Sequence, residues 1–178
     1  FDPVRHPFGR PTRKPMMSGL IVRVNPYLLN PLTIIRGYRN GEIAKIVSDV
    51  SITFSVDGFW ETVSLLHTFK KEQPIIRSIL ETVGPDDVFW DIGANLGIFA
   101  CYVSETIPDG SVVAFEPHPA NVERLRRNSS LNDCPMEIVD VALSDANGSA
   151  LLAVDSSRVS NQRYALETRT TGASIQVQ

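Results

Sequence analysis

Four residues whose types could do chemistry lie close together in "VFWDIGANLGIFA", residues 88–100: Asp91, Gly93, Asn95 and Gly97. They separate two apolar runs, of which the first is typical of a buried strand and the second of a helix. Glycine lets the backbone turn sharply and lets a ligand come close. The free N–H groups of the following helix would face such a ligand. The stretch therefore predicts either a tight strand-to-helix turn or a ligand-binding loop.

The spacing of these residues indicates which ligand the loop could bind. A dinucleotide site needs G-x-G-x-x-G, but counted from Gly93 the second glycine position holds Asn95 and the third holds Ile98. A pyrophosphate depends on close backbone approach at those positions, so a NAD site is disfavoured. Asp91 would also repel a phosphate. It would accept hydrogen bonds from a cationic or hydroxyl-bearing ligand instead, such as the amino-acid end of S-adenosylmethionine.

Acidic residues also follow the next two predicted strands. Glu116 ends the second strand, and its carboxylate could accept hydrogen bonds from both hydroxyls of a ribose. The third strand exits through Asp140 and Val141, where a carboxylate and the backbone could meet an adenine edge. Each residue also has a structural interpretation, since Glu116 could lie in a solvated turn and Asp140 could cap a loop. Their places at the ends of three successive strands favour a cofactor site.

The elements that must position these residues alternate along the chain from residue 86. Strand, helix, strand, helix and strand follow one another up to residue 142, which implies βαβ crossovers and a parallel sheet. Further strands are expected at 149–154 and 173–178, with a polar loop over 155–171. The first helix should bury one side and the second should turn its arginines outward. The residues concerned are Leu96, Phe99, Val103 and Ile107 in the first helix, and Val122 and Leu125 inward with Arg124, Arg126 and Arg127 outward in the second.

The chain before residue 84 is predicted to form a small α+β extension. Residues 20–40 should form short helical turns that end at Asn40, and period-two alternation over 42–57 predicts an antiparallel pair of strands. Residues 60–83 are predicted to form two short helices, with Pro74 opening the second. The expected divisions are a flexible Pro-rich arm, this extension and a cofactor-binding domain, at residues 1–19, 20–83 and 84–178.

Composition excludes several broad classes of protein. Of the 178 residues 43% are hydrophobic and 21% are charged, and the net charge of -3 predicts no nucleic-acid surface. No apolar run reaches the length of roughly 18 residues that a membrane span needs. Cys101 and Cys134 are far from any CxxC spacing, which predicts a reduced, cytoplasmic protein, and we expect no metal site. The start at Phe1 and the stop in a strand-like run at Gln178 suggest part of a longer protein.

Three segments together resemble the FkbM family of S-adenosylmethionine-dependent methyltransferases. They are "FWDIGANLGIFACYVS", "VVAFEPHPANVERLRRNSSLN" and "VDVALSDANGSALLAV", and the most specific parts are D-I-G-A-N-x-G and F-E-P-x-P in tandem. The resemblance covers roughly residues 86–154, with a weaker match from about residue 60. It implies a Rossmann-like class I methyltransferase fold, S-adenosylmethionine as cofactor, and methyl transfer to an oxygen. The implied acceptor is a small molecule or glycan, such as a hydroxyl of a sugar or natural product.

The resemblance also implies roles for individual residues. Asp91 and Gly93 would line the methionine end of the cofactor, Asn95 and Gly97 would shape the loop, Glu116 would hold the ribose, and Asp140 with Val141 would lie near the adenine. Family members continue into a strand bearing K-I-D-V-E-G, which this chain lacks. The parallel sheet is therefore expected to be incomplete, and such a chain should be poorly stable or self-associate through the open sheet.

No residue in the sequence is a convincing general base. His6 lies in the arm, His67 lies on a helix, and His118 should begin one. Cys101 and Tyr102 lie inside the first crossover helix, where packing is the better explanation. The catalytic residues therefore remain unassigned. Two alternatives stay open, namely a truncated, non-catalytic remnant of such an enzyme and, less favoured, a Rossmann nucleotide-binding oxidoreductase that would need the missing glycines.

Overall fold

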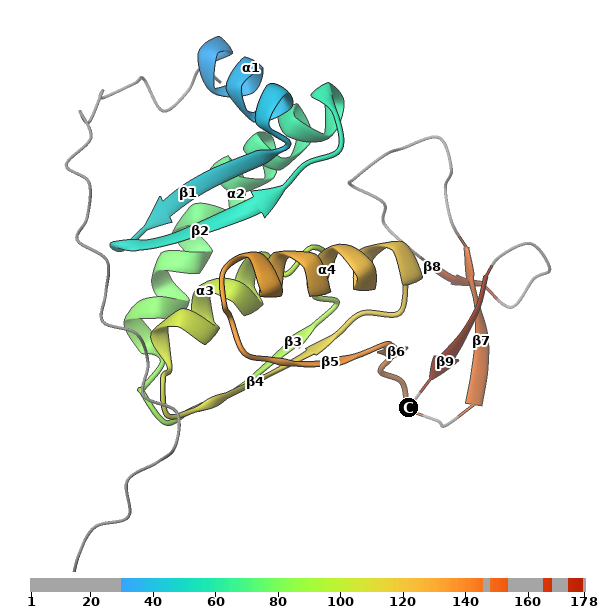
Figure 1. Ribbon diagram of the computed structural model, residues 1–178. Coiled ribbons are helices and arrows are strands. Elements are labelled where there is room, and N and C mark those ends of the chain that lie inside the picture. The colour runs from blue at the N-terminus through green and yellow to red at the C-terminus, as the bar shows by residue number, and fades with distance from the viewer. Residues whose placement is uncertain (1–29, 146–147, 154–164, 168–172, 178) are drawn as a thin grey trace, which may run out of the picture.

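The computed structural model describes residues 30–145, 148–153, 165–167 and 173–177 (Figure 1). The predicted arm at 1–19 lies outside the described residues, and so does most of the predicted polar loop at 155–171. Inside that predicted loop the structure has a short strand, β8 (Ala165–Glu167), which pairs antiparallel with β7 (Gly148–Ala153). The prediction of a loop was therefore wrong at these three residues.

A helix and a β-hairpin open the described chain. Helix α1 (Pro31–Asn40) begins where the Asn30 side chain accepts a hydrogen bond from the Leu32 N–H at 2.9 Å, and it ends at Gly41 in the left-handed conformation. Strands β1 (Glu42–Val47) and β2 (Val50–Ser55) then form an antiparallel pair. The predicted helical end at Asn40 and the predicted strand pair are both confirmed.

Helix α2 (Phe59–Thr82) runs without a break through Pro74. The prediction of two short helices was therefore wrong. Proline removes one backbone hydrogen bond and disfavours a helix interior, but apolar packing holds both halves of α2 in line. Phe69 before Pro74 and Ile76 after it are both buried in the same hydrophobic core.

The predicted βαβαβ unit is present. Strands β3 (Val88–Ile92), β4 (Ser111–Phe115) and β5 (Glu137–Val139) pair in parallel in that order, and helices α3 (Ile98–Thr106) and α4 (Pro119–Leu131) connect them. A second sheet has the order β6-β9-β7-β8, in which β6 (Val141–Ala142) is parallel to β9 (Ala173–Val177). The α/β class, the small parallel sheet and the two later strands are thus confirmed.

Helix α3 lies between the hairpin and the parallel sheet (Figure 1). Five consecutive residues of α3, from Ala100 to Ser104, are buried. Val103 packs in a core against the sheet, while Tyr102 packs in a second core with the hairpin and α2. The prediction that α3 buries one side was therefore incomplete, because the hairpin covers the side expected to face solvent.

Strand β3 is an edge of the parallel sheet, and its outward side chains are apolar. Val88, Trp90 and Ile92 alternate along the strand, and each is more than half exposed. The Trp90 ring packs edge-on against Phe115, with 5.5 Å between the ring centroids.

Across the described part of the chain, every helix is too short or too polar to cross a lipid bilayer.

Candidate cofactor-binding site

The glycine loop, residues 93–97, crosses over the end of strand β4. The N–H groups of Gly93 and Ala94 both donate to the carbonyl of Phe115, at 2.9 and 3.0 Å. Asn95 adopts a left-handed conformation with φ of 52°, and its N–H donates to Oε2 of Glu116 at 2.8 Å. The loop is therefore fastened both to the backbone of β4 and to the acid that follows it.

Gly93 and Gly97 have the same φ of 81°, which L side chains rarely adopt, but their surroundings differ. A Cβ on Gly97 would lie 2.4 Å from Cδ1 of Leu125, a fully buried residue of α4. Its positive φ and its close packing against α4 therefore both favour glycine at position 97. A Cβ on Gly93 would meet no heavy atom within 4 Å. Gly93 is therefore the glycine of this pair that leaves open space beside the backbone, as a bound ligand requires.

Asp91 is a buried carboxylate at the end of β3. The residue is 7% exposed, and its Oδ2 accepts a hydrogen bond from the Ala100 N–H in the first turn of α3 at 3.0 Å. Burial raises the pKa of Asp91 to about 6, and the negative charge of Glu116 adds to this effect while the Ala100 hydrogen bond opposes it. In the described residues no ion pair involves Asp91. A cationic group would therefore bind well beside this carboxylate.

Glu116 is 3% exposed, and most of its hydrogen-bonding capacity is already used. Its Oε2 accepts from Asn95, while its Oε1 accepts from the His118 N–H at 2.9 Å and from Nδ2 of Asn121 at 3.2 Å. A carboxylate has about four lone-pair sites, so about one remains. Glu116 can therefore accept one hydroxyl directly, and a second hydroxyl would have to replace the longer bond to Asn121.

Asp140 and Val141 follow β5 at the same edge of the sheet. The Glu116 N–H donates to the carbonyl of Val139 at 3.1 Å, which brings the exit of β5 beside the end of β4. Asp140 is exposed and lies 3.9 Å from Arg126, a long contact between exposed charges, whereas Val141 is buried in β6. The structure thus places Asp91, Glu116 and Asp140 at three adjacent strand ends, in the predicted order.

Tyr102 and Cys101, which the sequence analysis considered as catalytic groups, are held in packing and hydrogen-bonding contacts of the protein interior. Tyr102 donates its hydroxyl to the Lys45 carbonyl at 2.9 Å, and Sγ of Cys134 lies 3.5 Å from the Cys101 carbonyl. Hydrogen bonding to Cys134 and burial both raise the pKa of the Cys101 thiol, so it is a poor nucleophile. In the described ranges no three His, Cys, Asp or Glu side chains group as a metal site.

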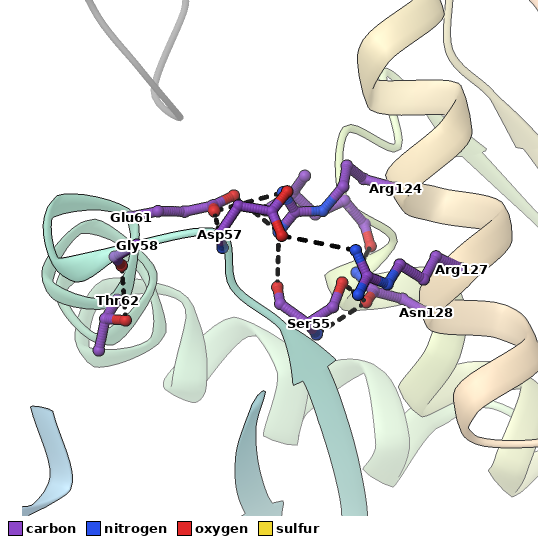
Figure 2. Close-up of polar contacts among 9 residues, drawn as sticks. Ser55, Asp57, Gly58, Glu61, Thr62, Arg124, Arg127 and Asn128 are labelled. Atoms are coloured by element: carbon purple, nitrogen blue, oxygen red, sulfur yellow. Dashed lines mark hydrogen bonds and ion pairs between the residues drawn. The ribbon is translucent and has the colours of Figure 1, made fainter. Parts of the chain in front are cut away.

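The polar face of α4 is the feature that the sequence reading missed. Arg124 was expected to point outward, but its side chain is only 14% exposed and this prediction was wrong. It pairs with Asp57 and Glu61, with 2.8 Å between Nη2 and Oε1 of Glu61 (Figure 2). Arg127 reaches Asp57 at 3.4 Å with both side chains exposed. The guanidinium of Arg124 therefore ties the start of α2 to α4.

A signal for this face is present in the sequence. Polar residues that can bond to backbone recur every four residues along α4, at Arg124, Asn128 and just past its end at Asn132. A spacing of four places side chains on one face of a helix. What the spacing did not indicate was the partner, because strand β2 lies about seventy residues earlier in the chain.

One hollow of about 580 Å³ lies elsewhere, between α1 and the hairpin, and Asn30, Arg36 and Glu42 are among its lining residues. It includes none of the predicted site residues. The candidate site is therefore placed at the buried carboxylates and the open space at Gly93 and not at this hollow, because buried ionisable groups beside open space can bind a charged ligand.

Comparisons with known proteins find partial matches to methyltransferases. No protein-family model matches the chain. The chain is 40% identical over 75 residues to the hexuronic acid methyltransferase AglP of Haloferax volcanii, which covers 42% of this chain and 28% of AglP. It is 36% identical over 64 residues to the 31-O-demethyl-FK506 methyltransferase FkbM of Streptomyces tacrolimicus, covering 36% of this chain and 25% of FkbM. The predicted resemblance to FkbM-type methyltransferases is confirmed, over about a quarter of each relative's length.

Solved structures show a more distant likeness. The tRNA (uracil-54, C5)-methyltransferase of Pyrococcus abyssi, solved with S-adenosyl-L-homocysteine, has a TM-score of 0.39 and 17% identity, covering 60% of this chain and 28% of that one. TYW2 of M. jannaschii, solved with AdoMet, has a TM-score of 0.39 and 16% identity, covering 56% of this chain and 44% of that one.

Proposed function

We propose that this chain carries the cofactor-binding part of an S-adenosylmethionine-dependent methyltransferase, within residues 84–178. The observation that carries the proposal is the pair of buried carboxylates, Asp91 and Glu116, on either side of a loop with open space at Gly93. A buried carboxylate without an ion-pair partner is costly, and such a group beside open space is a candidate for a functional site. The similarity to methyltransferases supports the choice of cofactor.

The residues fit the parts of this cofactor in the order in which they lie along the sheet edge. Asp91 would hold the cationic amino-acid end, and a positive charge there would favour the ionised carboxylate. The backbone at Gly93 and Asn95 would line the same end, with Gly97 fixing the helix start. Glu116 would accept a hydrogen bond from a ribose hydroxyl through its remaining lone pair. The sheet edge at Asp140 and Val141 would lie near the adenine.

The reaction that we propose is transfer of a methyl group to a hydroxyl oxygen of a sugar or natural product. When bound, S-adenosylmethionine would supply an electrophilic methyl group for the acceptor oxygen, whose hydroxyl proton would pass to a base or to water. Relatives that act on a hexuronic acid and on 31-O-demethyl-FK506 support this acceptor class. The chain's own residues in this step would orient the cofactor and exclude water, and we assign no general base.

Calorimetric titration of the chain with S-adenosylhomocysteine and with NAD tests the proposal. We expect S-adenosylhomocysteine to bind at pH 7.5 and NAD not to bind. Binding should weaken as the pH falls below about 6, because protonated Asp91 no longer attracts the amino group. Absence of binding by either ligand would support the non-catalytic remnant, and binding of NAD alone would support the oxidoreductase.

A further inference from the structure

The outer edge of strand β2 is satisfied by side chains of α4 and not by another strand. One edge of β2 pairs with β1, and the opposite edge presents the backbone groups of Thr53 and Ser55. The N–H and carbonyl of Thr53 bond to Oδ1 and Nδ2 of Asn132, both at 2.7 Å. The N–H of Ser55 donates to Oδ1 of Asn128 at 3.0 Å, and its carbonyl accepts from Nη2 of Arg124 at 2.7 Å. Figure 2 shows Ser55 facing Arg124 and Asn128.

The spacing of the two elements explains why a helix can replace a strand here. Four residues of an α-helix rise about 6 Å, and two residues of a strand rise about 6.7 Å. The side chains of Arg124, Asn128 and Asn132 therefore have nearly the same spacing along the helix as the backbone groups of Thr53 and Ser55 have along the strand. A carboxamide offers a donor and an acceptor, as a peptide group does. The helix thus covers a sheet edge that would otherwise be open.

Asn128 makes one contact that Asn132 does not make. Its Nδ2 donates to the carbonyl of Leu96 in the glycine loop at 2.9 Å, and the residue is fully buried. The second bond of the Asn132 amide goes instead to the Asn128 carbonyl within α4. The hydroxyl of Ser55 also donates to Oδ1 of Asn128, at 2.8 Å. One buried carboxamide therefore joins β2 to the loop that lies over the candidate cofactor site.

We propose that Asn128 is a positioning residue, which holds the Leu96 carbonyl against strand β2 and so fixes the glycine loop for the cofactor. This inference rests on the proposed function for the identity of the ligand. The Asn95 N–H, one residue before Leu96, is the donor to Glu116. Rotation of the peptides around Leu96 would therefore move the glycine loop and Glu116, the carboxylate proposed to bind the ribose, together. The hairpin thereby becomes part of the machinery that shapes the cofactor site.

Two matched substitutions test the positioning role, Asn128→Asp and Asn132→Asp. Each keeps the size and one acceptor oxygen and removes the donors. Asn128→Asp leaves the Leu96 carbonyl in the loop without its donor, whereas Asn132→Asp leaves the carbonyls of Thr53 in β2 and of Asn128 in α4 without theirs. Hydrogen exchange of the loop amides is measured without ligand, and S-adenosylhomocysteine affinity is measured by calorimetry. Both measurements are made at a temperature where circular dichroism shows each variant folded.

We expect Asn128→Asp to weaken S-adenosylhomocysteine binding about tenfold and to speed exchange of the loop amides by a similar factor, because a buried carbonyl loses its donor. Asn132→Asp should leave both quantities within about twofold of the wild type, since its bonds do not reach the loop. Equal effects of the two variants, or no effect of Asn128→Asp, would overturn the inference. If the wild type binds no S-adenosylhomocysteine, the proposed function fails, while the exchange comparison still decides the positioning role.

Ser55→Ala provides a milder variant in case Asn128→Asp does not fold. It removes the hydroxyl bond that orients the carboxamide and leaves the backbone bond in place. We expect loop exchange to rise about fivefold, because a net hydrogen bond contributes on the order of 1 kcal/mol and about 1.4 kcal/mol corresponds to a factor of ten. Unchanged loop exchange in this variant would count against the positioning role.

Discussion

The substitution Asp91→Asn separates the effect of the buried charge on stability from its effect on cofactor binding. Folding moves the pKa of Asp91 from the ordinary 3.8 to about 6, which corresponds to about 3 kcal/mol at about 1.4 kcal/mol per pKa unit. Because the folded-state pKa is raised, the folded protein binds this proton more tightly than the unfolded chain does. The carboxyl therefore lowers the free energy of unfolding as the pH rises from about 4 to about 6, and lowers it fully above that range.

Asparagine keeps an oxygen that can accept the Ala100 N–H and carries no charge. We therefore expect the variant to be more stable than the wild type by about 2–3 kcal/mol at pH 7.5 and about equally stable near pH 4. Urea unfolding followed by circular dichroism at both pH values measures the difference. Comparison at the same pH cancels the contributions of the carboxylates that lie apart from Asp91.

The same variant should bind S-adenosylhomocysteine at least about tenfold more weakly at pH 7.5, since a charge-assisted bond to the amino group is lost. Gain of stability with loss of binding is the signature of a strained functional carboxylate. Loss of stability that is the same at pH 7.5 and pH 4 would refute the reasoning. It would mean that Asp91 serves chiefly as a cap for α3.

Substitutions at three further places test separate parts of the structure. Gly97→Ala should lower the free energy of unfolding by about 2–4 kcal/mol, through positive-φ strain and a clash with α4. Gly93→Ala should lower it by only about 1–2 kcal/mol and should mainly weaken cofactor binding. Urea unfolding and calorimetry compare the two variants, and equal losses of stability would contradict the distinction. Glu61→Ala should cost about 2–3 kcal/mol in urea unfolding, because it removes the buried carboxylate partner of Arg124 and leaves it only the exposed Asp57 and the Ser55 carbonyl. Glu61→Gln should cost about half as much. A loss under 0.5 kcal/mol, roughly the scatter for a surface substitution, would show that the pair is not structural. We propose that the chain self-associates through the exposed apolar side of β3. Trp90→Ser should therefore reduce the concentration-dependent association that sedimentation velocity measures. Unchanged association in this variant would mean that the contact lies elsewhere on the protein.

The site residues could be found in the sequence because their positions are fixed by local chemistry. Asp91 and Glu116 each end an apolar run of strand length, and parallel strands joined by helices bring such ends to one edge of a sheet. The close spacing of Gly93, Asn95 and Gly97 indicated a sharp turn, and all three adopt positive φ. The sequence did not separate the two glycines, because one is required by a contact with Leu125 on another helix.

The surroundings of helix α3 show a second limit of sequence reasoning. Its apolar spacing predicted one buried side, and of these residues Val103 and Ile107 pack in the core of the parallel sheet whereas Leu96 lies in the core of the hairpin. The run from Ala100 to Ser104 is buried all round only because the hairpin and α2 pack against the other side. Likewise Pro74 predicted a helix boundary from local preference, and packing on both sides of it kept α2 continuous.

By itself, the sequence determined which residues end the three strands and that a parallel α/β sheet joins them, and its glycine spacing disfavoured a dinucleotide in the loop between β3 and α3. The tertiary structure alone decided that Arg124 turns inward and that Asn128 connects β2 to the glycine loop. The physical reason is distance along the chain. Periodicity and turn chemistry report on neighbours within a few residues, whereas the partners of α4 come from a strand about seventy residues away.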